Sequence, residues 1–235
     1  PIWPQGIDAP KEIPSVPPTL DWDLWLGPAK WRPYHPAYVP FAWRGWWDFG
    51  TGAIGDMGAH IIDHAYWPLK LKYPTRIQAS STPFTQDSPP IAEFLTYEFP
   101  AREGMPPVRL HWLDGGLKPP RPAELENERR LGDGGGGVLF IGSKGKLMCG
   151  TYGSNPRLIP EKVMQAYKRP EKTIPRSPGI HAEWIEACKK GDPNAATTNF
   201  EYSGPLTETM LLGNVAVQLA DKNIQLEYDG ETGQI

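Results

Sequence analysis

Cysteine is scarce in this sequence, since its 235 residues include only Cys149 and Cys188. Two thiols do not make the disulfide framework of a small secreted domain, and we expect both to be buried free thiols. Long apolar runs are also lacking, so no segment approaches the roughly 20 residues of a membrane-spanning helix. Positive charge is not in excess either, because the formal net charge is −3. Neither nucleic acid nor a membrane is therefore expected as a partner.

Glycine and proline are abundant, with 25 and 28 residues respectively. Hydrophobic residues still make up 39% of the chain, which is enough for a packed core, so we interpret the glycines and prolines as long ordered loops. The chain begins with Pro1 rather than Met and stops at Ile235, just after a strand-like run. We expect a single domain truncated at both ends, with its location, cytoplasmic or periplasmic, left open.

Residues 1–50 form an unusual segment that holds seven of the ten tryptophans, together with many prolines. Proline excludes long helices and central strands, so we expect an irregular aromatic arm with one short helical turn near Asp21–Leu26. Its rings offer a large rigid contact area. They can pin the arm to its own domain, or they can form a sugar-binding wall or a subunit interface.

The remaining residues, 51–235, show the periodicities of helices and strands. We expect helices over Gly55–Leu71, Ile180–Lys190 (with Gly191 as its stop) and Leu206–Ala220, and strands over Arg76–Pro83, Ile91–Phe99, Val108–Leu113 and Ile224–Tyr228. A β-hairpin is expected where Val138–Ile141 and Lys146–Tyr152 flank Gly142-Ser143-Lys144-Gly145, between long loops at 114–137 and 153–177. Consecutive strands predict an α+β fold, with an open, mainly antiparallel sheet and helices on one face. The other face of the open sheet must be covered or used, and we expect a homo-oligomer to form through it, as an uncovered apolar face would favour.

Two glycine strings match the pattern of a dinucleotide-binding loop. The first, Gly50-x-Gly52-x-x-Gly55, opens a helix but follows Trp46-Trp47-Asp48-Phe49 rather than a hydrophobic strand. The second, Gly132-x-Gly134-x-x-Gly137, leads into a strand. We interpret both as turns that allow close backbone approach, and we expect no cofactor-binding residue in this chain.

The first predicted helix carries Asp56, His60 and His64 at four-residue steps. This spacing places the three side chains on one helical face. A carboxylate that orients a histidine is the usual arrangement for proton transfer near neutral pH. We therefore expect Asp56 and His60 to act together, although Asp56 at the helix start could instead be only a first-turn acid.

A metal site is the alternative interpretation of the same helix. Two histidines one turn apart can bind a metal ion, and His60 and His64 have that spacing. However, the sequence H-I-I-D-H lacks the glutamate of the usual zinc helix, and no third ligand can be found. We therefore prefer proton transfer and expect no metal.

At this point the sequence resembles a known family. The stretch from Gly52 to Asp63, GAIGDMGAHIID, is similar to the motif G-G-x-L-x-D-x-G-x-H-x-x-D of the Gfo/Idh/MocA sugar oxidoreductases. Further similar stretches are Asp21–Pro28, Arg32–Pro36, Trp46–Gly52, Phe140–Gly145 and Gly204–Glu208, so the resemblance to this family, and to a subgroup common in bacteria, extends over nearly the whole chain.

The resemblance implies a C-terminal, substrate-binding domain whose parent protein also has an N-terminal Rossmann domain for NAD or NADP. By resemblance, Asp56 and His60 match the catalytic aspartate and histidine, and His60 would take the proton from a sugar or polyol hydroxyl. The catalytic lysine of the family has no counterpart in this sequence, so we expect the isolated chain to be inactive and the parent to be an enzyme. From proximity alone, Arg44, Trp47 and His64 are predicted to line the sugar site.

Three functions therefore remain open at the level of sequence. The first is the substrate half of an NAD(P)-dependent sugar or polyol oxidoreductase, or of a relative that cleaves glycosidic bonds through a keto sugar. The second is a non-catalytic carbohydrate-binding or interaction module. The third is a metal-dependent hydrolase or isomerase that uses His60 and His64.

Overall fold

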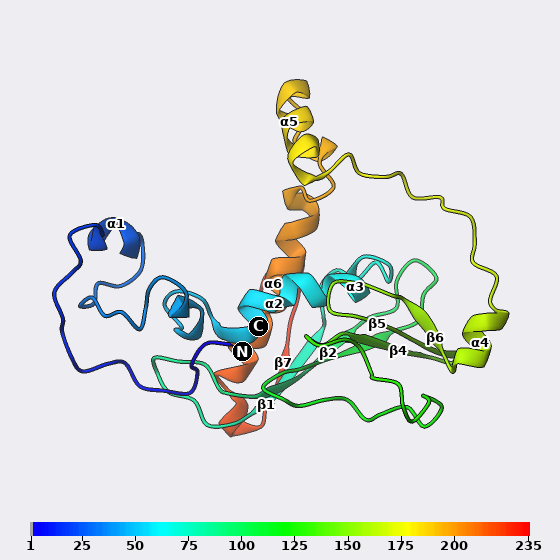
Figure 1. Ribbon diagram of the computed structural model, residues 1–235, viewed down its shortest axis with the longest axis horizontal. Coiled ribbons are helices and arrows are strands. Elements are labelled where there is room, and N and C mark those ends of the chain that lie inside the picture. Colours follow the sequence, from blue (N-terminus) through cyan, green and yellow to red (C-terminus); the bar gives the residue numbers. More distant parts are fainter. Residues whose placement is uncertain (1) are drawn as a thin grey trace. The chain divides into compact units, whose positions relative to one another are not determined.

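The protein is described by a computed structural model that covers residues 2–235. Helices and two antiparallel sheets confirm the predicted α+β class (Figure 1). The chain folds into two compact units that interleave along the sequence. Unit 1 comprises residues 2–59, Tyr73–Pro119 and Thr209–Ile235, and unit 2 comprises His60–Lys72 and Pro120–Glu208. None of the helices within residues 2–235 is long and apolar enough to cross a membrane.

Unit 1 is built on a four-stranded sheet in the order β3-β2-β1-β7. Its strands are β1 (Arg76–Ser81), β2 (Glu93–Phe99), β3 (Val108–Leu113) and β7 (Gln225–Glu227), and every pairing is antiparallel. Strand β2 buries alternate residues, as the two-residue period of a strand requires when one face is covered. On that face Leu95, Tyr97 and Ile77 are fully buried.

The inner face of this sheet packs against helices α2 (Gly52–Ile61) and α6 (Phe200–Val217). A Cβ atom added to Gly213 of α6 would lie 2.1 Å from the Tyr97 hydroxyl oxygen and 3.1 Å from Ile54 Cδ1 of α2. The Tyr97 hydroxyl donates a hydrogen bond to the Met210 carbonyl oxygen at 3.5 Å. Glycine at position 213 therefore lets the helix approach the sheet closely.

The outer face of the sheet is mostly polar. Arg109 forms an ion pair with Glu98 at 2.7 Å, and Thr96 contacts the ring of His111. The outer face is thus not the apolar, uncovered face that would favour homo-oligomer formation, because charged and hydroxyl side chains occupy most outward positions of the strands. Homo-oligomer formation through this face remains a prediction.

Unit 2 contains a three-stranded antiparallel sheet in the order β4-β5-β6. Strands β4 (Val138–Gly142) and β5 (Gly145–Cys149) form the predicted hairpin, and β6 (Arg157–Ile159) pairs with β5. Leu125, Met148 and Ile159 form the centre of its core. The unit also holds α3 (Asp63–Tyr66), α4 (Glu161–Ala166) and α5 (Ile180–Lys190), whose bounds and glycine stop, a left-handed Gly191, agree with the prediction.

Several predicted boundaries are wrong for local reasons. The helix expected over Gly55–Leu71 is two helices, because α2 starts earlier, at Gly52, and a turn at Ile62 separates it from α3. Helix α6 begins one and a half turns before the predicted Leu206, since the Asn199 side chain accepts a hydrogen bond from the Tyr202 amide and caps it. Strand β6 and helix α4 lie in the segment predicted as a loop, 153–177; both are short and follow prolines.

The aromatic arm has a core of its own within unit 1. Helix α1 (Trp22–Leu26) forms where a helical turn was predicted, capped by Asp21. Its Trp22 stacks on Trp25 with ring centroids 4.8 Å apart. Trp22 is buried in one cluster with four other residues, Leu26, Tyr34, Tyr38 and Trp46. Burial of this kind favours the structural interpretation of most arm aromatics over a sugar-binding wall.

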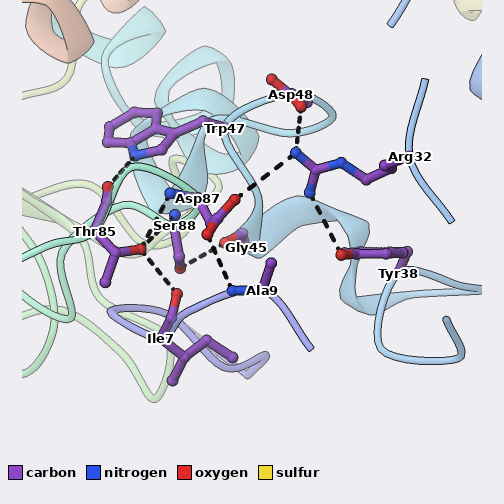
Figure 2. A network of polar contacts seen from close by, with 10 residues as sticks. All are labelled: Ile7, Ala9, Arg32, Tyr38, Gly45, Trp47, Asp48, Thr85, Asp87 and Ser88. Carbon is purple, nitrogen blue, oxygen red and sulfur yellow. Dashed lines mark hydrogen bonds and ion pairs between the residues drawn. The ribbon is translucent and has the colours of Figure 1, made fainter. Parts of the chain in front are cut away.

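A polar network ties the arm to the loop between β1 and β2 (Figure 2). Arg32 forms ion pairs with Asp48 at 2.5 Å and with Asp87 at 3.8 Å. The Ser88 hydroxyl donates to the Gly45 carbonyl oxygen at 2.7 Å, and the Thr85 hydroxyl donates to the Ile7 carbonyl oxygen at 2.9 Å. These bonds satisfy the backbone of a segment that has little regular structure.

A buried carboxyl group in unit 1 makes stability depend on pH. Burial, with a contribution from the neighbouring Asp114 carboxylate, raises the pKa of Glu93 from 4.5 to about 9. Between these values the folded protein holds a proton that the unfolded chain releases, so stability falls as pH rises. Burial raises the pKa of Asp114 and that of Tyr97 as well.

We expect the Glu93→Gln variant to flatten this pH dependence. The wild-type protein should lose stability between about pH 5 and pH 9 with a slope of up to about 1.4 kcal/mol per pH unit. The variant cannot ionise at position 93 and should lose clearly less over the same range. Urea unfolding at several pH values measures both slopes, and parallel slopes would contradict the buried protonated Glu93.

Candidate functional site

Asp56 lies on α2, and its carboxylate is held by an arginine of the arm. Because α2 starts at Gly52, Asp56 is one turn inside the helix, and the expectation that it sits at the helix start is wrong. Arg44 Nε donates to Asp56 Oδ1 at 2.8 Å, and both side chains are about one quarter exposed, 24% and 23%. Arg44, predicted from proximity alone, is thus the direct partner of Asp56.

The position of Arg44 is set by aromatic rings. Arg44 belongs to the 3₁₀ turn Ala42–Gly45, and its guanidinium carbon lies 4.4 Å from the ring centroids of both Phe41 and Trp43. Its Nη1 donates to the Phe41 carbonyl oxygen at 3.1 Å. Cation–π contacts of this kind hold a guanidinium in one orientation. The Trp/Pro-rich arm therefore places a fixed positive charge next to Asp56.

We expect Arg44→Met to destabilise the protein by about 1 kcal/mol, because a partly exposed ion pair and its ring contacts are lost. The stability of the Arg44→Lys variant should lie between that of wild type and that of Arg44→Met, since lysine keeps the charge but not the planar stacking. Arg169 is an exposed arginine and offers the matched control Arg169→Met. Equal urea midpoints for the Arg44→Met and Arg169→Met variants would show that the Arg44–Asp56 pair contributes nothing.

His60 lies on α2 one helical turn after Asp56 and is exposed. Within unit 2 its ring makes an edge-to-face contact with Tyr152, with centroids 5.6 Å apart and an interplanar angle of 83°. Tyr152 is itself 69% exposed. No sequence pattern drew attention to this tyrosine, because it lies in a loop more than 90 positions away from His60.

His64 is fixed by the same loop. Its Nε2 lies 2.9 Å from the Thr151 carbonyl oxygen, and a carbonyl only accepts, so this nitrogen carries the proton. The other ring nitrogen, Nδ1, keeps its lone pair in this tautomer. In addition, no group of three or more metal-ligating side chains was found within residues 2–235. The geometry therefore gives His64 a hydrogen bond to the Thr151 backbone, and the absence of a metal stays a prediction.

The remaining motif residue of this region, Asp63, accepts a short hydrogen bond from the Tyr202 hydroxyl of α6. Burial, together with that bond to a negative carboxylate, raises the pKa of Tyr202. The Tyr202 ring also meets Tyr66 edge-to-face at 5.9 Å. Asp63 therefore joins α3 to the first part of α6 within unit 2.

Trp47, the other predicted lining residue, is anchored in unit 1. Its Nε1 donates to the Thr85 carbonyl oxygen at 3.1 Å (Figure 2). Its ring meets Phe84 edge-to-face at 6.2 Å. Its predicted role in lining a sugar site stays a prediction.

The loop that contacts His60 and His64 is stabilised by hydrogen bonds to Asp133. This carboxylate accepts from the Thr151 hydroxyl at 2.6 Å, from the Thr151 amide at 2.8 Å, and from the amides of Gly135 and Gly136. The hydrogen bonds lower the pKa of Asp133 to about 2. The second glycine string thus forms a turn around Asp133, as the interpretation of it as a turn predicted.

An open pocket of about 690 Å³, lined by both polar and apolar surface, lies in unit 2. The charges of two of its lining arginines are balanced within the unit, since Arg129 pairs with Glu126 and Glu161, and Arg157 pairs with Glu161. Ser154 and Asn155 add neutral polar groups.

The two glycine strings do not have the local structure of a dinucleotide-binding loop. The first glycine string is preceded by turns rather than by a strand. The space over Gly50 is filled by the chain itself, since a Cβ there would lie 2.4 Å from the Arg44 Cα atom. The second string leads into β4 rather than into a helix. Neither forms the strand–turn–helix cradle that binds a pyrophosphate.

The first part of the chain matches a known family model. Residues 5–100 match the family model described as oxidoreductase family, C-terminal alpha/beta domain. This segment contains the arm, Arg44, the helix with Asp56 and His60, and strands β1 and β2. No curated protein matches the chain significantly.

Proposed function

Since residues 5–100 match the C-terminal domain of the Gfo/Idh/MocA oxidoreductase family, we propose that this chain is the substrate-binding and proton-transfer part of an NAD(P)-dependent sugar or polyol oxidoreductase. The observation that carries the proposal is the position of His60 in the structure. It is an exposed imidazole one turn after Asp56, beside an exposed aromatic ring. Sugars are commonly bound by such a combination of an aromatic face and a few polar groups.

In the proposed reaction, His60 accepts the proton of a sugar hydroxyl while the carbon that bears this hydroxyl becomes a carbonyl. Histidine is suited to this role because its ordinary pKa lies near neutral pH. Asp56, whose carboxylate is paired with Arg44, lies one turn earlier on the same helix. The nicotinamide, when bound, supplies the hydride acceptor. We propose that it is held by residues outside this chain, in a dinucleotide-binding domain.

The proposal is tested with the complete protein, a panel of sugars and polyols, and NAD⁺ or NADP⁺ as oxidant. The absorbance of the reduced nicotinamide reports turnover. We expect turnover with at least one pyranose or cyclic polyol. Sugar binding without turnover with either nicotinamide would instead favour the carbohydrate-binding module.

A further inference from the structure

The loop that follows β5 has a fixed backbone. Within residues Gly150–Ser154, the Gly150 amide donates to the Ser154 carbonyl oxygen at 2.8 Å, and the Gly153 amide donates to the Gly150 carbonyl oxygen at 2.9 Å. Thr151 is bound on one side by Asp133 and on the other by His64. Because hydrogen bonds to Asp133 and His64 fix Thr151, the next residue projects from a rigid backbone.

That next residue is Tyr152, whose ring is placed against His60 and is 69% exposed. An exposed aromatic ring on a flexible loop needs no explanation. The Tyr152 ring does need an explanation, because a hydrogen-bonded loop holds it beside a candidate general base. The fold thus orders this ring while leaving most of its apolar surface in water. Aromatic faces attract the C–H groups on the apolar side of a sugar ring.

We propose that Tyr152 is the platform on which the apolar face of a pyranose or cyclic polyol stacks, so that a hydroxyl of the ring reaches His60. Asp133 is a positioning residue for this platform, because it holds Thr151. This inference rests on the proposed function for its catalytic meaning, but the stacking itself is a binding event that can be measured separately.

The experiment uses the complete protein and three variants. Tyr152→Ala removes the ring, and Tyr152→Phe keeps it without the hydroxyl. Tyr167→Ala is the matched control, because Tyr167 is another exposed tyrosine of unit 2, 49% exposed. The probes are D-glucose, methyl β-D-glucoside and myo-inositol, with affinity measured by calorimetry without nicotinamide and KM measured on whichever probe is turned over.

We expect Tyr152→Ala to weaken binding and to raise KM about tenfold, while Tyr152→Phe and Tyr167→Ala stay within about twofold of wild type. Asp133→Asn should also raise KM, by a smaller factor. An affinity for the probes that is the same in Tyr152→Ala, Tyr167→Ala and wild type would overturn the platform. Wild-type protein that binds none of the three probes would overturn it as well.

The two proposals fail in different ways. If Tyr152→Ala weakens sugar binding but His60→Ala leaves turnover intact, the platform stands and the catalytic role of His60 falls. If turnover depends on His60 but KM and affinity do not respond to the loss of the Tyr152 ring, the proposed function stands and the platform falls.

Discussion

Replacing His60 with alanine in the complete protein is expected to lower kcat for sugar oxidation by about 10²- to 10⁴-fold. The reason is that the variant loses the only proposed acceptor for the hydroxyl proton, while the helix that carries it is otherwise unchanged. His60 is exposed, so its removal leaves no buried cavity. Substrate affinity should change far less than kcat, because the main loss is in the transition state.

His181 provides the matched control for this experiment. It is another exposed histidine of unit 2, on α5. His181→Ala should keep wild-type turnover, and a thermal unfolding scan of both variants checks that neither is misfolded. Equal kcat values for His60→Ala and wild type would remove His60 from the mechanism and leave the family match without a proton acceptor.

Replacing Gly213 with alanine is expected to destabilise the protein by about 2–3 kcal/mol, since overpacking of a tight core is costly. The added Cβ would lie 2.1 Å from the Tyr97 hydroxyl oxygen and 2.9 Å from Leu95 Cδ1. Both side chains are fully buried on the sheet that α6 covers, so neither can move aside. The melting temperature should fall by roughly 5–10 °C.

Gly58 on α2 is the matched control for Gly213. A Cβ added there would lie 2.9 Å from Met210 Cγ, and methionine is a flexible side chain that can repack. Alanine also favours a helix over glycine by up to about 1 kcal/mol. Gly58→Ala should therefore stay within about 1 kcal/mol of wild type. A melting temperature of Gly213→Ala as close to wild type as that of Gly58→Ala would contradict the tight packing of α6 on the sheet.

Much of the local structure follows from patterns in the sequence. The three strands β1, β2 and β3 and helix α5 lie close to their predicted ranges, because alternation, helical period and a glycine stop are local signals. Asp56 and His60 were predicted as candidates in the same way, since four-residue spacing on a helix needs no tertiary information. Helix starts were predicted less well, because Asn199 caps α6 before Pro205, a residue that usually breaks a helix.

The partners of the candidate residues could not be predicted. Arg44 was expected near the site only because it is near in sequence, and its bond to Asp56 depends on the ring contacts that orient it. Asp133 and Thr151 belong to a glycine-rich loop and to the segment after β5, with no motif that links them to a histidine. A single exposed tyrosine in a loop likewise carries no signal of its own.

The sequence by itself therefore determined the helix that carries Asp56 and His60, since a face of a helix is defined by spacing along one short segment. Only the tertiary structure decided what surrounds that helix. It paired Asp56 with Arg44, bound His64 to Thr151, and set Tyr152 beside His60. These contacts join residues up to 92 positions apart, and such pairs come together only when burial of the shared cores outweighs the entropy of closing the chain between them.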